Sequence, residues 1–327
     1  MRSAVSGRGS SVKRLGSVVV APRALRVEII ALLIGVWELV AHFVITRVGT
    51  SGEPIFPSIE YLARDSFLQM SNYWSGGWGA PAPSNGGAQT YWGAVLALIS
   101  ASLASFERLA IGIIGGMVLG AVVGLVVSAS AAARSVLSGP VQLLRMVPFL
   151  ALAPLFEVWF GKSNFGAILF IGYGSLVVTI VGVINAVALL PSVQLARART
   201  EGANRLEIYR WVVMPGILPP MRATILVVLG LGWTLDVAAE MLGAQNGLGV
   251  IMEYALRFAY TGRVILVSMV YLLYAAISFY FLQWLTGWAI HWHPSQADRG
   301  RRRLRAPADL NLEATEAGDG AKQPVPA

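Results

Sequence analysis

The chain has no cysteine among its 327 residues, which excludes disulfide bonds, thiolate metal sites and thiol catalysis. Charge is also scarce: Asp, Glu, Lys and Arg make up 13% of the chain, against about a quarter of an ordinary globular protein. Hydrophobic residues make up 56%. Because so few charged side chains cannot cover a water-facing surface, we expect much of the surface to face lipid.

The net charge of +8 is gathered in three clusters of Arg and Lys, at residues 2–26, 197–222 and 299–305. Clusters of this kind flank membrane spans on the cytoplasmic side. They are not accompanied by an aromatic-studded basic face, so we expect no nucleic-acid partner. The lipid bilayer is the expected environment of the chain.

Apolar runs of roughly 20 residues are long enough to cross a bilayer as a helix. Six candidates lie at about residues 27–47, 108–128, 139–160, 165–190, 221–242 and 264–290. Six spans place both termini on one side, and the basic clusters predict that this side is cytoplasmic. We therefore predict an all-α integral membrane protein with a transmembrane domain over 27–293, a basic cytoplasmic tail over 1–26 and a disordered cytoplasmic tail over 294–327. Residues 57–70 are expected to form a surface helix.

Glycines recur at four-residue spacing in the second predicted span, at Gly112, Gly116, Gly120 and Gly124. This spacing lines one face of a helix with glycine, which allows another helix to approach closely. We favour tight packing within the bundle over a direct role in transport.

The segment 191–221 is too rich in charge to lie in the bilayer, and it contains no helix breaker until Pro215. It predicts a helix outside the membrane with Leu195, Ala198, Gly202, Leu206 and Tyr209 on one apolar or small face. Such a helix either lies on lipid or fits a groove in a partner. With Gly202 inside a helix, alanine is expected to be tolerated there, since alanine has the higher helix propensity.

The stretch ARARTEGANRLEIYRWVVMPGILPP, residues 196–220, resembles the cytoplasmic loop signature of permease subunits in binding-protein-dependent ABC importers. The match rests on Ala198, Gly202, Ala203, Pro215 and Pro219, whereas Ala196 and Arg197 stand where the signature opens with Glu-Ala. Further segments resemble the nitrate, sulfonate and taurine branch of this family: WELV at 37–40, FPSIEYL at 56–62, LLRMVPFLALAPLFEVWFG at 143–161, AAEML at 238–242 and NGLG at 246–249.

The resemblance implies a type I importer permease in the inner membrane, with ATP and Mg²⁺ bound by a separate cytoplasmic ATPase dimer and no cofactor on this chain. It also implies a second permease copy, most simply an identical one, and an extracytoplasmic solute-binding protein. The residues it assigns to the coupling helix, which docks on the ATPase, are Ala198, Arg199, Glu201, Gly202, Ala203, Leu206, Tyr209 and Pro215. Nitrate, sulfonates, taurine and pyrimidine precursors all remain open as the solute.

The residues themselves offer no catalytic site. FGKS at 160–163 lacks the first glycine of a phosphate-binding loop, which would stand five residues before Gly161, where the chain has Phe156. The three histidines are too few and too scattered for a metal site. We therefore predict a transport subunit and not an enzyme.

Ionisable residues inside spans are costly in lipid and usually face the bundle interior or a water-filled path. Asp236 and Glu240 are four residues apart and share a helix face, where they either line or gate the pathway or bond neighbouring helices. Arg145 either extends to water, pairs with an acid or attracts an anion, and Glu38 is expected to face protein. The rival interpretation is an ion-coupled secondary transporter with Asp236 and Glu240 as coupling sites.

Overall fold

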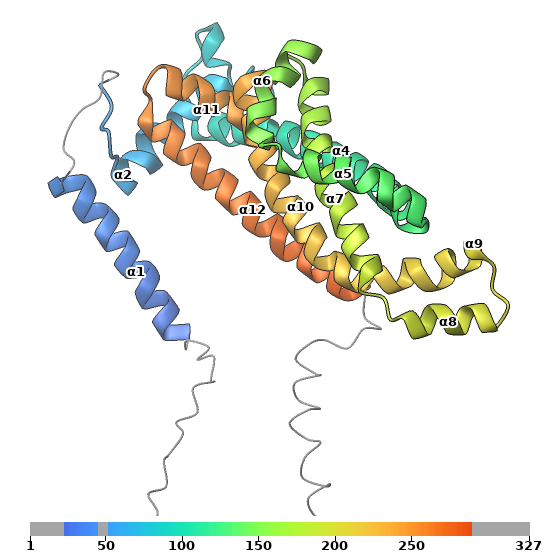
Figure 1. Ribbon diagram of the computed structural model, residues 1–327. Helices are drawn as coiled ribbons and strands as arrows, with labels where there is room; N and C mark the ends of the chain where they lie inside the picture. Colours follow the sequence, from blue (N-terminus) through green and yellow to red (C-terminus); the bar gives the residue numbers. More distant parts are fainter. Residues whose placement is uncertain (1–22, 45–51, 290–327) are drawn as a thin grey trace, which may run out of the picture.

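The computed structural model describes residues 23–44 and 52–289, and within these ranges the chain is almost entirely helical, without β-strands. The predicted tails over 1–26 and 294–327 fall outside the described residues, apart from the first turn of α1 (Arg23–Leu39). This helix continues into a π-helical turn, Val40–Val44. Figure 1 shows α1 beside the bundle, with its axis roughly aligned with that of α12 (Thr261–Ala289) and the chain running in the opposite direction.

The predicted surface helix at 57–70 is present as a succession of short helical pieces: α2 (Ile59–Tyr61), a π-helical turn (Leu62–Ser66), α3 (Phe67–Gln69) and a 3₁₀ turn (Met70–Tyr73). Leu62 and Met70 are buried, so one face packs against the bundle. A loop with a further 3₁₀ turn, Pro83–Asn85, leads into α4 (Tyr91–Ala129).

Helices α4 and α7 (Asn164–Ala188) pack closely along the glycine stripe. All four glycines are buried. A Cβ atom added at Gly116 would lie 2.7 Å from the Ser175 Cβ, and one added at Gly120 would lie 2.8 Å from the Thr179 Cβ. These separations are shorter than carbon atoms tolerate. The interpretation of the stripe as a packing face is confirmed.

Of the six predicted spans, the third is not one continuous helix. The run at 139–160 is divided into α5 (Ala131–Met146) and α6 (Phe149–Phe160), which meet at 93°. Pro148 causes this break, because proline has no N–H to donate and disfavours helix at the residue before it; Val147 is accordingly extended, with ψ of 125°.

The first predicted span, at 27–47, reaches beyond the described residues, and its apolar helical part covers only Ala31–Phe43. Within the described ranges, four helical segments are long and apolar enough to cross a membrane, or five if the bent pair α5 and α6 counts as one. The four are Tyr91–Ala129, Asn164–Ala188, Arg205–Leu242 and Thr261–Ala289.

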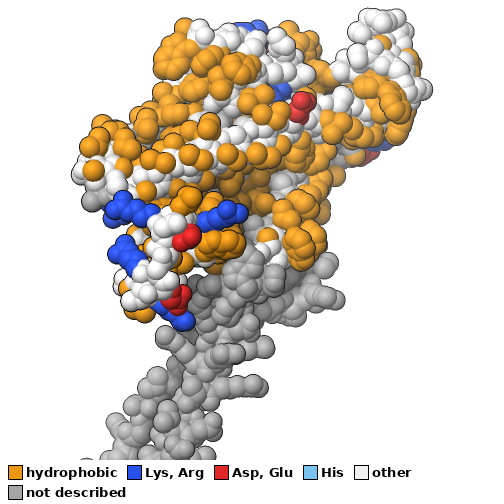
Figure 2. All heavy atoms as spheres, turned by 90° about the vertical axis from the view of Figure 1, so that its right-hand side faces the viewer, with side chains coloured by type: hydrophobic (Ala, Val, Ile, Leu, Met, Phe, Trp, Pro, Cys, Tyr) orange, Lys and Arg blue, Asp and Glu red, His pale blue; other side chains and the backbone are white. Residues whose placement is uncertain are grey.

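Two buried apolar clusters hold the bundle together. The larger one joins α4, α7, α10 (Met214–Leu242), α11 (Leu248–Arg257) and α12 through residues such as Phe170, Leu235 and Leu248. The smaller one lies at the other end of α7 and α10 and contains Val183, Ala186, Ile208, Val213, Ile217 and Met221. Figure 2 shows that the face toward the viewer is mostly hydrophobic, with most of its charged side chains gathered at the lower end.

Candidate functional site

Asp236 and Glu240 lie one turn apart on α10, and both side chains are buried, with 0% and 2% of the residue exposed. Arg108 of α4, which is 2% exposed, lies against both acids. Its Nη2 donates to Glu240 Oε1, and its Nε lies 3.8 Å from Asp236 Oδ1. We call Arg108, Asp236 and Glu240 the buried charge cluster. The shared acidic face predicted from the sequence is therefore present, and it faces protein.

Glu240 is fully supplied with hydrogen-bond donors from three other elements. Its carboxylate accepts from Ser105 Oγ of α4 at 2.6 Å, from Tyr271 Oη of α12 at 2.8 Å and from the Gly249 N–H in the first turn of α11. The position at a helix N-terminus also favours a negative charge. Glu240 thus joins α4, α11 and α12 to α10.

Arg108 is further bonded to two turns between helices. Its Nη1 donates to Asn164 Oδ1 at 3.1 Å and to Asn246 Oδ1 at 2.7 Å. Asn164 begins α7, and Asn246 lies in the turn between α10 and α11. The Asn164 Nδ2 also donates to Asn246 Oδ1 at 3.2 Å, which ties the two turns to each other.

Asp236 contrasts with Glu240. Both of its carboxylate oxygens are buried and have no hydrogen-bond partner within residues 23–44 and 52–289. A buried polar group without a partner costs about 1–3 kcal/mol. Within the buried charge cluster, Arg108 faces two acids and donates a hydrogen bond to Glu240 but not to Asp236.

Arg108 is the member of the buried charge cluster that sequence reasoning missed. The second span was predicted to begin at about residue 108, so Arg108 stood at its edge, whereas α4 begins at Tyr91 and places Arg108 well inside the helix. The available signal was the apolar character of residues 91–106, which continue the helical run on the other side of Arg108.

The two remaining ionisable candidates do not join the cluster. Arg145 is exposed in the last turn of α5. Glu38 is half-buried and accepts the Ile59 N–H at 2.7 Å, with His42 Nδ1 at 3.3 Å. Glu38 faces protein, as expected, and its partner is the first turn of α2.

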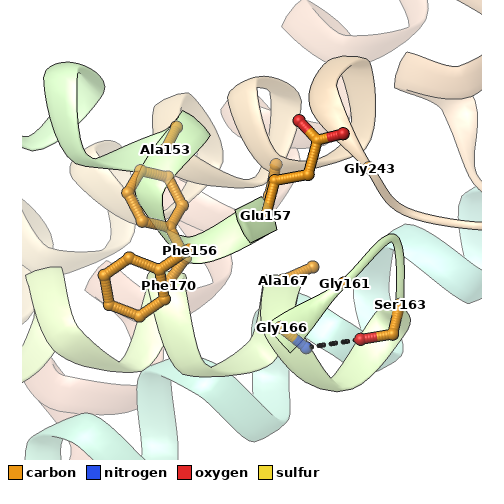
Figure 3. Close-up of a pocket in the computed structure, with 10 residues that line it drawn as sticks. Ala153, Phe156, Glu157, Gly161, Ser163, Gly166, Ala167, Phe170 and Gly243 are labelled. Carbon is orange, nitrogen blue, oxygen red and sulfur yellow. Dashed lines mark hydrogen bonds between the residues drawn. The ribbon is translucent and has the colours of Figure 1, made fainter. Parts of the chain in front are cut away.

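A small cavity adjoins the last turn of α10 and is lined by Phe156, Glu157 and Phe170 among others (Figure 3). Figure 3 shows the rings of Phe156 and Phe170 next to each other, and their centroids are 5.3 Å apart. The cavity has a volume of about 20 Å³, which suits roughly one water molecule and excludes an organic solute.

The segment predicted as one helix outside the membrane is a hairpin of two short helices, α8 (Ser192–Thr200) and α9 (Arg205–Ile208). The helix ends before Gly202, whose φ of +86° is left-handed. The Gly202 N–H donates to Arg199 O and the Ala203 N–H to Ala198 O, at 3.1 and 3.0 Å, which is a Schellman cap. The prediction that Gly202 lies inside a helix and tolerates alanine is wrong, because a left-handed φ penalises any Cβ.

The chain then re-enters helix at Arg205 because Asn204 and Glu207 form a reciprocal capping box. The helix continues through a π-helical turn, Tyr209–Val213, into α10. Pro215 does not end it and stands directly after the π-helical turn.

The predicted single face of this segment is divided in two. Leu195, Ala198, Ala203 and Tyr209 pack on the smaller apolar cluster. Leu206 instead is 78% exposed, and Arg199, Glu201, Gly202 and Pro215 are also exposed. The break at Gly202 reverses the chain, so residues at helical spacing across it do not share a face.

The relatives found by comparison with known proteins are named as permease proteins. The chain is 31% identical over 162 residues to the taurine transport system permease protein TauC of Escherichia coli (strain K12), covering 50% of this chain and 59% of that protein. It is 27% identical over 191 residues to the putative aliphatic sulfonates transport permease protein SsuC of Bacillus subtilis (strain 168), covering 58% and 69%. It is 29% identical over 163 residues to the nitrate import permease protein NrtB of Leptolyngbya laminosa, covering 50% and 58%.

The matched part thus spans about three-fifths of the taurine relative's own length. Among solved structures, the inward-facing MetNI methionine ABC transporter matches with a TM-score of 0.49 and 21% identity, over 59% of this chain and 94% of that chain. Residues 112–288, more than half of the chain, match the family described as binding-protein-dependent transport system inner membrane component. The chain belongs to this family.

Proposed function

We propose that this chain is the membrane-spanning permease subunit of an ATP-driven importer, and that the hairpin of α8 and α9 docks on a separate ATPase. ATP and Mg²⁺ are then bound by that partner. Two copies of the permease form the pathway, and a solute-binding protein delivers the solute on the other side. The protein lies in the inner membrane with both termini in the cytoplasm.

The hairpin is the observation that carries this proposal. Figure 1 shows α8 and α9 at the end of the bundle opposite α11 and α6. The hairpin is anchored from inside by Ile208 on the smaller apolar cluster. The hairpin exposes Leu206, and the π-helical turn that follows it exposes Trp211, with 78% and 70% of each residue accessible. A firmly held element that presents large apolar side chains outside the bundle suits a groove in a partner.

The relatives are named for taurine, aliphatic sulfonates and nitrate, all of which carry an acidic oxygen-rich group. A small solute of this class is therefore what we propose for this chain. The buried charge cluster is closed to such a solute, since its three residues are at most 2% exposed. The contacts of the cluster with four helices instead support a role in holding these helices together at a gate. Arg145 is exposed, and we propose it as a residue that contacts an anion in the pathway.

Leu206 provides the test of docking. In Leu206→Trp, a protein groove would be overfilled, whereas lipid would accept the larger aromatic side chain. We expect this variant to insert normally and to lose ATPase co-purification and transport. Leu189→Trp is the matched control, since Leu189 is a 73% exposed leucine at the end of α7 and outside the hairpin. Full ATPase binding and transport in Leu206→Trp would refute docking through this face.

A further inference from the structure

Helices α10 and α12 meet along a seam at the hairpin end of the bundle, where Figure 1 shows the end of α12 beside α10. Arg222 of α10 is exposed at this seam, and its Nη2 donates to the backbone carbonyl of Gln283 on α12 at 3.1 Å. The guanidinium lies beside Gly287, where an added Cβ atom would stand 3.7 Å from Nη2. We call these three residues, together with exposed Trp284 and Trp288 of α12, the seam site.

The Arg222 guanidinium has hydrogen-bonding capacity to spare. An arginine side chain carries five N–H donors. Within residues 23–44 and 52–289, Arg222 donates to Gln283 O and forms no ion pair. Helix α12 contains no Asp or Glu, and both acids of α10 belong to the buried charge cluster at its other end. The seam therefore holds a fixed positive charge without a counter-charge from the described residues.

An apolar aromatic surface lies next to this charge. Trp284 and Trp288 are one helical turn apart, with 65% and 71% of each residue exposed. Phe281 is also exposed, and its ring centroid lies 6.0 Å from that of Trp284. Tryptophan is typical of the membrane–water interface, where its apolar ring and its polar N–H both find a suitable environment. The surface beside Arg222 thus has the composition of a lipid-contacting interface.

The length of α12 places the seam site near the headgroups of the bilayer. Its 29 residues extend about 43 Å, compared with roughly 30 Å for the hydrocarbon core, so the helix ends reach the headgroup region. Gln283 lies six residues before Ala289, about 9 Å along the helix from that end. An arginine side chain can extend over a distance of this size toward the lipid phosphates.

From this geometry we propose that the seam site binds the phosphodiester of an anionic phospholipid, with Nε and Nη1 of Arg222 donating to the phosphate oxygens and the acyl chains lying against Trp284 and Phe281. The planar guanidinium matches phosphate in a bidentate geometry. An ammonium headgroup would find no carboxylate in the seam, which favours phosphatidylglycerol over phosphatidylcholine. The proposal goes beyond import, because it involves neither the solute nor the ATPase.

Titration of the full chain in detergent micelles with brominated phosphatidylglycerol, followed by quenching of tryptophan fluorescence, tests the proposal. We expect saturable quenching for the wild type and about tenfold weaker binding for Arg222→Gln, the effect of losing a hydrogen bond between charged groups. Arg222→Lys keeps the charge without the planar fork and should have an intermediate affinity.

Arg134→Gln is the matched control. Arg134 is exposed near the start of α5, and its Nη2 donates to the Ser128 carbonyl at the end of α4 at 3.4 Å. Like Arg222, it is an exposed arginine bonded to a backbone carbonyl, but α5 contains no aromatic residue. Arg134→Gln should therefore bind phosphatidylglycerol like the wild type. Equal weakening in both variants would overturn the seam site and indicate general attraction between the basic end and anionic micelles.

Competition separates a lipid site from a site for free phosphate. Unlabelled phosphatidylglycerol should compete with the brominated lipid, and phosphatidylcholine should compete more weakly. Glycerol phosphate and inorganic phosphate should not compete at the same concentration, because they lack acyl chains that contact the aromatic surface. Competition by inorganic phosphate as strong as that by phosphatidylglycerol would overturn the lipid assignment.

Thermal unfolding provides a second measurement. Phosphatidylglycerol at about a hundred times its Kd should raise the unfolding temperature of the wild type and of Arg134→Gln, but not of Arg222→Gln. Without added lipid, Arg222→Gln should unfold close to the wild-type temperature, since the side chain is exposed. Equal affinity of the wild type and Arg222→Gln, or no saturable quenching of the wild type, would overturn the proposal.

Discussion

The two acids of the buried charge cluster should respond in opposite ways to loss of their charge. Glu240 accepts from Arg108, Ser105 and Tyr271 as well as from a backbone N–H, whereas Asp236 has no hydrogen-bond partner within the described ranges. We therefore expect Glu240→Gln to destabilise the bundle and Asp236→Asn to be tolerated.

The change in the free energy of unfolding depends on which charges and hydrogen-bonding groups remain unpaired after each substitution. Glu240→Gln places an amide NH₂ among groups that donate, and leaves Arg108 with Asp236 at 3.8 Å as its counter-charge. Breaking a buried ion pair from one side costs about 3–5 kcal/mol. Asp236→Asn removes an acid that Arg108 does not bond, and leaves Arg108 and Glu240 as a neutral pair. Its effect should be within about 1 kcal/mol and of either sign.

Thermal unfolding of both variants in the same detergent, followed by tryptophan fluorescence, measures the difference. Trp233 reports on this region because its ring packs against Tyr271 at a centroid distance of 6.0 Å. Asp236→Leu extends the series, since it replaces an unpartnered carboxylate with an apolar side chain of similar size. If Asp236→Asn unfolded as early as Glu240→Gln, Asp236 would have to pair with a group that the described residues do not provide, and this reasoning would be wrong.

Three further expectations concern packing, the hairpin and topology. Gly116→Ala should cost about 1–3 kcal/mol by forcing α4 from α7, while Gly115→Ala on the open face of the same helix should be neutral or stabilising in the same unfolding assay. Gly202→Ala should cost roughly 1 kcal/mol and raise tryptic cleavage of the hairpin about fivefold; unchanged cleavage would contradict the left-handed cap. In this cysteine-free chain, Ser84→Cys should react with an impermeant thiol reagent in intact cells and Ser192→Cys only after permeabilisation, and the reverse pattern would invert the orientation.

The sequence predicted best where a residue's role depends on local periodicity. Asp236 and Glu240 share a face because they are four residues apart, and the glycine stripe meets α7 because its four members have the same spacing. Both relations are set within one helix, so they do not require knowledge of the fold.

The errors concern places where one residue changes the direction of the chain or brings distant segments together. The sequence does not distinguish a glycine that packs inside a helix from one that ends it. The capping hydrogen bonds of Gly202 and Ala203 show that Gly202 ends the helix. Pro148 divides a run whose hydropathy alone resembles one span. Arg108 meets Glu240 across 132 positions of sequence, and no periodicity indicates such a contact.

Helices α7 and α10 connect the hairpin to the buried charge cluster. Both contribute to the smaller apolar cluster at the hairpin end, through Val183 and Ile217. At the other end, α7 begins with Asn164 and α10 carries Glu240, which are both bonded to Arg108. From Met221, beyond its two internal prolines, α10 has unbroken helix to Leu242, about 30 Å at 1.5 Å per residue. We treat this part of α10 as a rigid body. If an ATPase displaces the hairpin, as proposed, the movement of α10 would strain the hydrogen bonds of Arg108 to Asn164 and Glu240. These hydrogen bonds must then either hold the helices in place or break as the helices move.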